Sequence, residues 1–435
     1  MNSIIYEADE TQEQTVSVFL MMMLEYADEI GLWQLLNEKV NIQMKKVVYS
    51  TLNKAQTVIA SLVAGCAHTK AINDKLSEEQ AAAHYLGLAR FPDQSQINRY
   101  LTRFNAENIS ELGQVHAALF VAHAQSRRAK GQIVVDIDQC GLVANGKSYE
   151  LARKGYFPRK RGEQGYQLSL AYVGAYDEAV QLYLDPGNVG CRDRLADLLG
   201  DIDRQLGQDN PGVTLIRRLD AGYDSAENRR LLTSLPGYFI MKGGRSDSAA
   251  RLATGIALQD WLPVAAGVHG TELPAAEGVR RLLYEFCLAD GSVTYSLLYT
   301  NLPPNDFGLI GCFAFYNERQ TIEACFAQSR HVYNIQNMRS RQFNAIYAFL
   351  RFVFLTHNLI HWAKQERLAH TPFAKATSKQ LFQQVGRVRA RSFWDGQWHL
   401  LIPTSARWAA TLLDALMPKP IPIQLELPFA RLHKT

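Results

Sequence analysis

The chain has 435 residues, of which 47% are hydrophobic and 20% charged. It is therefore long enough for two or three folded domains and has an ordinary globular composition, which excludes a disordered or fibrous protein. The formal net charge of +4 at pH 7 is too small to indicate a nucleic-acid partner by itself.

The charges are unevenly distributed along the chain. Residues 1–40 hold eight Asp and Glu but one Lys, whereas residues 127–161 hold nine Lys and Arg and three acidic residues. Two further tracts, 330–364 and 375–391, each hold five Lys and Arg and no acidic residue. Basic tracts on a nearly neutral chain are typical of a DNA-binding surface, although a solvated face explains any single tract equally well.

Neither the cysteines nor the apolar runs indicate an exported or membrane protein. The six cysteines form no CxxC pair and no Cys/His metal spacing, so we expect reduced, mostly buried thiols and a cytoplasmic location. The N-terminus is acidic, with no basic segment before the apolar run at 16–24, which argues against a signal peptide. The apolar stretch 343–362 contains Arg351, His357 and His361, which are costly in lipid, so a buried core helix is expected and no membrane partner.

Residues 1–128 are predicted to form an all-helical N-terminal domain. A capped helix over 95–105 carries Asn98, Arg99 and Arg103 and is a candidate DNA-recognition helix. A packing helix with a polar outer face explains the same residues. Helical periodicity without a long alternating run covers residues 14–37, 44–65, 76–90 and 106–128.

Strands and helices are predicted to alternate over residues 129–242. In the first strand, alternation places Val134, Asp136 and Asp138 on one face. Residues 243–302 then break the alternation with glycine-rich turns and two strand-like runs joined by Asp290-Gly291, a strong hairpin signal. We therefore expect a mixed α/β core that a β-rich insertion splits. The expected strands are 131–138, 166–174, 179–184, 212–219 and 237–242, and the expected helices are 189–206 and 224–234.

The last third of the chain is predicted to return to helices. A helix over 303–330 follows Pro303-Pro304, and the apolar helix over 341–366 closes the segment 303–370. Residues 371–435 are expected to form a hairpin that turns at Asp395-Gly396 and a helix over 404–416.

Three carboxylates stand in separate, well-formed local contexts. Asp138 ends the apolar run VVDID, Asp220 ends the run LIRRLD, and Glu323 lies in the helical segment YNERQTIEACFAQSR. Two strand-end aspartates and one helical glutamate supply the oxygen ligands that a site for two Mg²⁺ ions needs, which indicates phosphodiester chemistry. Either aspartate alone is also explained as a turn cap.

The glutamate belongs to a regular stripe on the expected helix. Tyr316, Arg319, Glu323 and Arg330 lie at i, i+3, i+7 and i+14, so they share one helical face. An ordinary salt-bridged surface would show the same spacing.

These segments together resemble the DDE-type insertion-sequence transposases of the cut-and-paste group, which have a ribonuclease-H-like core. The family pattern is Tyr, two residues, Arg, three residues, Glu, six residues, Lys; Tyr316, Arg319 and Glu323 fit it, whereas Arg330 replaces the lysine. The stretch RLDAGYDS resembles the family's R-x-D-x-G-F/Y signature. The resemblance covers residues 131–403 in order and extends to the N-terminal region only loosely, through FPDQSQINRYLTRF.

The resemblance implies a site and a function. Asp138, Asp220 and Glu323 would be the catalytic ligands of two Mg²⁺ ions, with Mn²⁺ as a substitute. Asp136 is the alternative to Asp138, which we prefer because small polar residues follow the family's aspartate. Trp261, in the insertion, is a candidate for stacking on a displaced base, with a core tryptophan as the alternative. The residues expected to contact DNA are Tyr316, Arg319, Arg330, Arg153, Lys154, Arg159, Lys160 and Arg161.

The implied partners are double-stranded DNA, as element ends and as target, and a second copy of the chain in a paired-end complex. The implied reaction cleaves DNA at terminal inverted repeats and joins the 3′-ends to target DNA. Two alternatives remain open from the sequence: a two-metal structure-specific endonuclease on the same core, and a domesticated regulator that binds DNA without cutting it.

Overall fold

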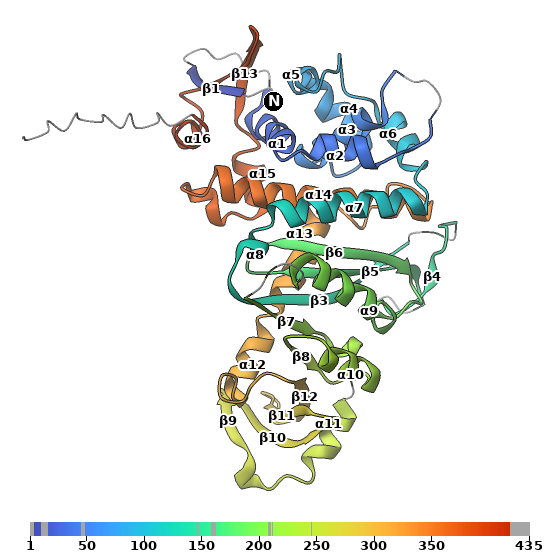
Figure 1. Ribbon diagram of the computed structural model, residues 1–435, viewed down its shortest axis with the longest axis vertical. Helices are drawn as coiled ribbons and strands as arrows, with labels where there is room; N and C mark the ends of the chain where they lie inside the picture. The colour runs from blue at the N-terminus through green and yellow to red at the C-terminus, as the bar shows by residue number, and fades with distance from the viewer. Residues whose placement is uncertain are drawn as a thin grey trace, which may run out of the picture.

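The computed structural model describes residues 4–9, 16–44, 48–144, 146, 148–157, 162–207, 210, 212–244 and 246–417. The molecule is elongated, with the N-terminal helices at one end, a central sheet, and the insertion at the other end (Figure 1). Arg159, Lys160 and Arg161 of the predicted DNA-binding tract lie outside the described residues.

Five strands form the centre of the molecule in the order β6-β5-β3-β7-β8. The first strand, β3, pairs antiparallel with β5 and parallel with β7, and β8 pairs parallel with β7. In chain order this is third-second-first-fourth-fifth, the arrangement of a ribonuclease-H-like core, so the predicted fold class is confirmed. The elements are β3 (Gly131–Val143), β5 (Gln164–Val173), β6 (Glu178–Pro186), α9 (Cys191–Ile202), β7 (Val213–Leu219), α10 (Ala226–Ser234) and β8 (Tyr238–Lys242).

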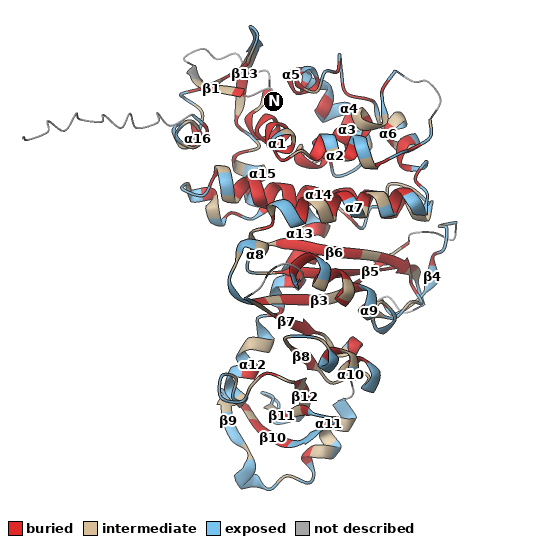
Figure 2. Ribbon diagram, in the orientation of Figure 1, coloured by how far each residue is buried: buried red, intermediate tan, exposed pale blue. Residues whose placement is uncertain are grey.

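The long apolar helix α14 (Phe343–Arg367) lies against this core, as the sequence predicts. In the described part of the chain it alone is long and apolar enough to span a membrane, and 89% of its apolar window is buried inside the protein (Figure 2). Asn358 fixes it to β6, because its amide accepts the backbone N–H of Ala179 at 2.8 Å and donates to the carbonyl of Ala179 at 2.8 Å. The indole of Trp362 donates to Glu178 at 2.9 Å, so these two polar side chains of the helix have partners inside the protein.

The N-terminal segment is not all-helical, which corrects the prediction. Two short strands, β1 (Ile4–Asp9) and β2 (Val16–Ser17), form a four-stranded sheet with the C-terminal hairpin of β13 (Arg389–Trp394) and β14 (Trp398–Pro403). The partner strands are almost four hundred residues away in sequence, so no local pattern indicated the pairing. The remaining N-terminal elements are α1 (Val18–Glu29), α2 (Leu32–Lys39), α3 (Thr51–Val63), α4 (Lys70–Lys75), α5 (Gln80–Tyr85), α6 (Gln94–Leu101), α7 (Ala106–His123) and α8 (Gln125–Arg128).

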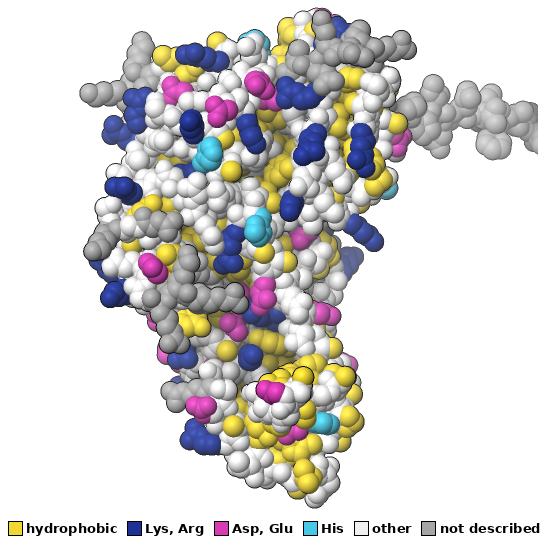
Figure 3. Space-filling view, turned by 180° about the vertical axis from the view of Figure 1, so that it is seen from behind, with side chains coloured by type: hydrophobic (Ala, Val, Ile, Leu, Met, Phe, Trp, Pro, Cys, Tyr) yellow, Lys and Arg dark blue, Asp and Glu magenta, His cyan; other side chains and the backbone are white. Residues whose placement is uncertain are grey.

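The insertion continues the central sheet and does not form a separate one. Its last strand pairs antiparallel with β8, which gives a single ten-stranded sheet. The predicted turn at Asp290-Gly291 is confirmed, with Gly291 at φ 79°. Hydrophobic side chains are exposed at this end of the molecule (Figure 3), among them Leu258, Leu262 and Ile310. The elements are α11 (Ser246–Ala253), β9 (Leu262–Ala265), β10 (Val268–Ala276), β11 (Val279–Cys287) and β12 (Val293–Thr300).

The predicted helix over 303–330 is two helices, α12 (Leu309–Asn317) and α13 (Gln320–Val332), which is a further correction. The backbone N–H of Arg319 bonds to the carbonyl of Tyr316 at 3.1 Å, so the carbonyl of Phe315 is left for another donor. The two helices pack against different parts of the protein. Helix α12 packs against apolar side chains of the insertion strands, whereas α13 buries Ile322 and Phe326 against the core. Tyr316 therefore does not share a helical face with Glu323. The C-terminal helices are α15 (Ser378–Gln384) and α16 (Ala409–Leu416).

Candidate active site

The three carboxylates singled out in the sequence line one cleft of about 1120 Å³. Asp138 lies within β3, and Asp220 follows the last residue of the neighbouring parallel strand β7. Glu323 reaches the same cleft from the first turn of α13. The sheet register explains why the two aspartates lie close together. Ile137 is paired with Leu219, and Asp138 and Asp220 directly follow these two residues.

The guanidinium of Arg319 lies between the three carboxylates. It is 3.0 Å from Asp138 Oδ2, 3.8 Å from Asp220 Oδ1 and 3.0 Å from Glu323 Oε1. Burial raises the pKa of Asp138, although the Arg319 charge opposes this shift. The side chain of Asp138 is only 14% exposed, whereas those of Asp220 and Glu323 are 42% and 59% exposed. The site is thus a half-open ring of negative charge around one cationic group.

This donor set fits divalent cations with a preference for oxygen. One positive group already contacts oxygens of all three side chains, which shows that the carboxylates converge on a place where positive charge is stabilised. Mg²⁺ and Mn²⁺ favour carboxylate ligands with positions left for water and phosphate, and the open side of the cleft offers that room. Asp138, Asp220 and Glu323 are the residues that would hold the ions.

Asp136 has a different environment from Asp138. It is fully buried, and its two oxygens accept from Arg218 Nε at 2.6 Å and Arg218 Nη2 at 2.9 Å. Thr321 Oγ1 donates to it at 2.8 Å. Because its oxygens are already engaged and it does not line the cleft, Asp136 is suited to holding the site together. Asp138 lines the cleft, and its role as a ligand stays a prediction.

Arg218 is the residue that sequence reasoning missed. Its Nη1 donates to the carbonyl of Phe315 at 2.5 Å, the backbone group that the break between α12 and α13 leaves free. Arg218 and Asp136 together therefore connect β3 and β7 to the start of the helix that carries Glu323. The signal was present in the sequence, since Arg218 is the arginine of RLDAGYDS and Asp136 shares a strand face with Asp138.

A close contact at Gly174 lets α13 approach the sheet. A Cβ atom at this position would lie 2.7 Å from Thr321 Cβ. We expect Gly174→Ala to lower the free energy of unfolding by about 1–3 kcal/mol, typical of overpacking, and to slow DNA cleavage because Glu323 moves with α13. Urea unfolding and a cleavage assay measure the two effects.

The matched control is Gly200→Ala within α9, where a Cβ atom would meet nothing within 4 Å. This change is expected to be neutral or to stabilise by up to about 1 kcal/mol, because alanine restricts the unfolded chain. Equal stabilities of the Gly174 and Gly200 variants would show that the approach of α13 tolerates a side chain.

The other predicted DNA-contacting residues are not all at the cleft. Arg330 lines it, and its Nη2 lies 3.1 Å from Cys140 Sγ. Tyr316 does not line it; burial raises the pKa of its hydroxyl, and the charge of neighbouring Arg319 opposes that shift. Trp261 packs against Tyr295 in a small cluster of the insertion, with ring centroids 6.1 Å apart, which agrees with a core role.

Arg153 and Lys154 form the short strand β4 (Arg153–Lys154) and are both exposed. They pair with β5, and the segment after them returns to the cleft through Tyr156, which is 83% exposed. The next residue, Phe157, is buried against Gly141, where a Cβ atom would lie 2.5 Å from the ring. The described part of the basic tract therefore leads directly into the edge of the carboxylate cleft.

Comparison with known proteins identifies the family. The family model of the transposase DDE domain group 1 matches residues 14–243, and that of the transposase DDE domain matches residues 129–359. No curated protein matches. A solved synaptic complex of piggyBac transposase with hairpin DNA is 11% identical over 94% of this chain and 87% of that chain, with a TM-score of 0.46. A Mos1 mariner paired-end complex with Mn is 12% identical over 48% of this chain and 65% of that chain, with a TM-score of 0.18.

The fold and the carboxylate cleft define a ribonuclease-H-like protein with a three-carboxylate centre. Each family match spans just over half of the 435 residues. The chain belongs to the DDE transposase family, and its class of activity is that of a DNA-cutting, DNA-transposing enzyme.

Proposed function

We propose that this transposase binds the terminal inverted repeats of a mobile element, cleaves the DNA there by metal-assisted phosphodiester hydrolysis, and joins the 3′-ends to target DNA. The observation that carries the proposal is the convergence of Asp138, Asp220 and Glu323 around one cationic group in an open cleft. Divalent cations held by these carboxylates would activate the attacking oxygen and stabilise the leaving oxygen of an in-line displacement.

The protein's own residues supply the positioning. Arg319 neutralises the carboxylates in the state described; when cations take this role, its planar fork is released toward a DNA phosphate, which arginine binds in bidentate fashion. Arg330 presents a second guanidinium on the same wall of the cleft. Arg218 and Asp136 keep α13 in register with the two strands, so that Glu323 stays opposite the aspartates.

DNA is expected to approach along the basic tract that begins at β4. Arg153 and Lys154 are exposed next to the cleft, and Tyr156 offers an aromatic face on which a base can stack. Holding two element ends at once requires two active sites, so we also propose a homodimer in the DNA-bound complex. We also propose that the enzyme works in the cytoplasm of a bacterial cell, in association with the nucleoid.

Replacing Arg153 and Lys154 by Ala should weaken the salt dependence of binding to an element end. Each lost phosphate contact lowers the log–log slope by about 0.9 for duplex DNA, so the pair should lower it by up to about 1.8. Replacing the residues at positions 159–161 by Ala as well should lower the slope further. Fluorescence anisotropy over a range of salt concentrations measures the slope.

The control removes the same charge elsewhere, with Arg230→Ala and Arg251→Ala on exposed positions that do not line the cleft. That pair is expected to keep the slope of the parent. If the slope falls as much in the control as in the Arg153 and Lys154 variant, DNA binding depends on net charge and the basic tract does not contact the DNA.

Strand transfer distinguishes the proposal from its two rivals. Purified enzyme with a labelled element end, target DNA and Mg²⁺ should give both cleaved ends and joined products. Cleavage without joining would favour the structure-specific endonuclease, and binding with neither product would favour the regulator.

A further inference from the structure

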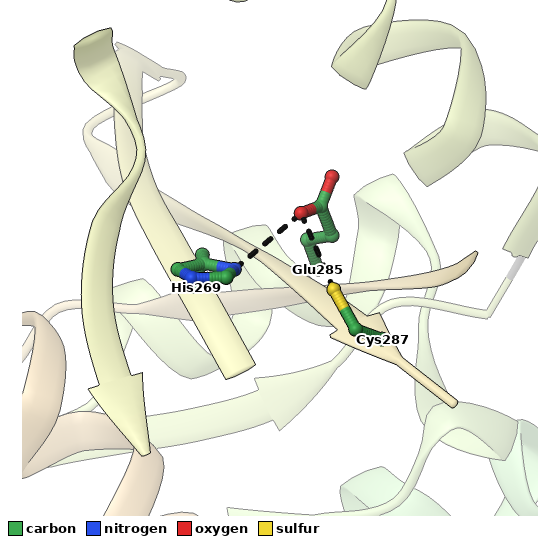
Figure 4. A group of neighbouring side chains, drawn as sticks. All are labelled: His269, Glu285 and Cys287. Carbon is green, nitrogen blue, oxygen red and sulfur yellow. Dashed lines mark hydrogen bonds and ion pairs between the residues drawn. The ribbon is translucent and has the colours of Figure 1, made fainter. Parts of the chain in front are cut away.

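A second group of potential metal ligands lies in the insertion, on the outer part of the ten-stranded sheet. His269 is on β10, and Glu285 and Cys287 are on β11 (Figure 4). One donor atom from each side chain lies within 4.8 Å of the other two. None of these residues lines the carboxylate cleft, so the group is separate from the candidate active site.

Strand pairing creates this group, since the sequence contains no Cys/His metal spacing. His269 and Glu285 are directly opposite each other in the antiparallel pair of β10 and β11. Cys287 is two residues beyond Glu285, so its side chain points to the same face of the sheet. Its backbone N–H donates to the carbonyl of Gly267 at 2.8 Å, which fixes the end of β11 against the start of β10.

Two of the three donor distances are close to those of a tetrahedral zinc site. His269 Nδ1 is 3.5 Å and Cys287 Sγ is 3.9 Å from the same atom, Glu285 Oε1. Bond lengths near 2.0–2.3 Å in a tetrahedron place neighbouring N, O and S ligands roughly 3.3–3.6 Å apart, so both distances to Glu285 Oε1 are within a few tenths of an ångström of that geometry. The donor atoms of His269 and Cys287 lie within 4.8 Å of each other.

The surroundings orient the carboxylate and leave one side open. Tyr295 on β12 donates its hydroxyl to the other oxygen, Glu285 Oε2, at 3.2 Å, so Oε1 faces the histidine and the cysteine. A hydrogen bond of this kind to a liganding group is a common support of metal sites. Cys287 is exposed and the side chain of His269 is 42% exposed, so a water molecule can take a fourth position.

We propose that His269, Glu285 and Cys287 bind one Zn²⁺ ion that links β10 to β11 in the insertion. A thiolate and an imidazole select a softer cation than an all-oxygen site does. We therefore expect Zn²⁺ to bind in the insertion and Mg²⁺ to bind in the carboxylate cleft. Binding deprotonates Cys287, and the proton is released to solvent as the sulfur–zinc bond forms.

The test uses the tag-free, full-length protein and Co²⁺ as the spectroscopic probe for Zn²⁺. One equivalent should give a thiolate-to-cobalt charge-transfer band, which Zn²⁺ abolishes by displacement and millimolar Mg²⁺ does not. Cys287→Ser should eliminate the band. His269→Ala should weaken binding by at least about a hundredfold, the upper end of what losing a mere supporting group costs.

Two control variants show whether the band arises from Cys287 and not from another cysteine or from the carboxylate cleft. Cys191→Ser changes the other cysteine that is not fully buried, and Asp138→Asn changes the carboxylate cleft; both should keep the band and its stoichiometry. Zn²⁺ should raise the melting temperature of the parent and of these controls but not that of Cys287→Ser. A parent protein without the band, or a band that survives Cys287→Ser, would overturn the proposal.

Discussion

Asp138→Asn, Asp220→Asn and Glu323→Gln are each expected to reduce the rate of DNA cleavage by at least about 1,000-fold, because residues that act as one unit are nearly as costly to lose singly as together. All three line the cleft, and Asp220 and Glu323 are at least two-fifths exposed, so their amides should fit without disturbing the fold. Pairwise combinations should lose little more than the single changes.

Cleavage of a labelled element end in Mg²⁺ measures the rates, and binding to the same DNA together with urea unfolding shows that the variants are intact. Asp260→Asn, on an exposed turn of the insertion, removes the same charge away from the cleft and should cut at the parent rate. Substantial cleavage by any one cleft variant would remove that residue from the catalytic set.

The second large effect is expected in stability. Arg218→Met leaves the Asp136 carboxylate buried without its two charged hydrogen bonds. Breaking a buried ion pair from one side typically costs about 3–5 kcal/mol, and we expect this loss in the free energy of unfolding. Cleavage should fall as well, because Arg218 also holds the carbonyl of Phe315 in the last turn of α12, next to the start of α13.

The double variant Arg218→Met, Asp136→Asn tests whether the unpaired charge of Asp136 causes the loss of stability. The second substitution removes the buried, unpaired charge of Asp136, so the double variant should be more stable than Arg218→Met alone. A double-mutant cycle measures this non-additivity. Arg230→Met, on an exposed face of α10, is the matched control and should stay within about 0.5 kcal/mol of the parent. A stability of Arg218→Met close to that of Arg230→Met would contradict the positioning role.

Local sequence patterns were enough to predict the strands of the core and the class of the protein. Local alternation and turn residues are short-range signals, so they located β3, β7 and the Asp290-Gly291 hairpin close to their observed positions. The order of the segments around Asp138, Asp220 and Glu323 indicated the DDE family, which the family models confirm. The roles of the individual site residues remain predictions.

Features that depend on contacts between distant segments could not be predicted from the sequence. Residues Ile4–Asp9 became a strand because the C-terminal hairpin presents an edge to them, and no neighbouring residue encodes that edge. The helix before Glu323 broke because its two halves pack on different surfaces and Arg218 takes the freed carbonyl of Phe315. The ring of carboxylates around Arg319, the burial of Asp136, and the meeting of His269 with Cys287 arise in the same way, because strand register and helix packing bring together side chains that sequence spacing keeps apart.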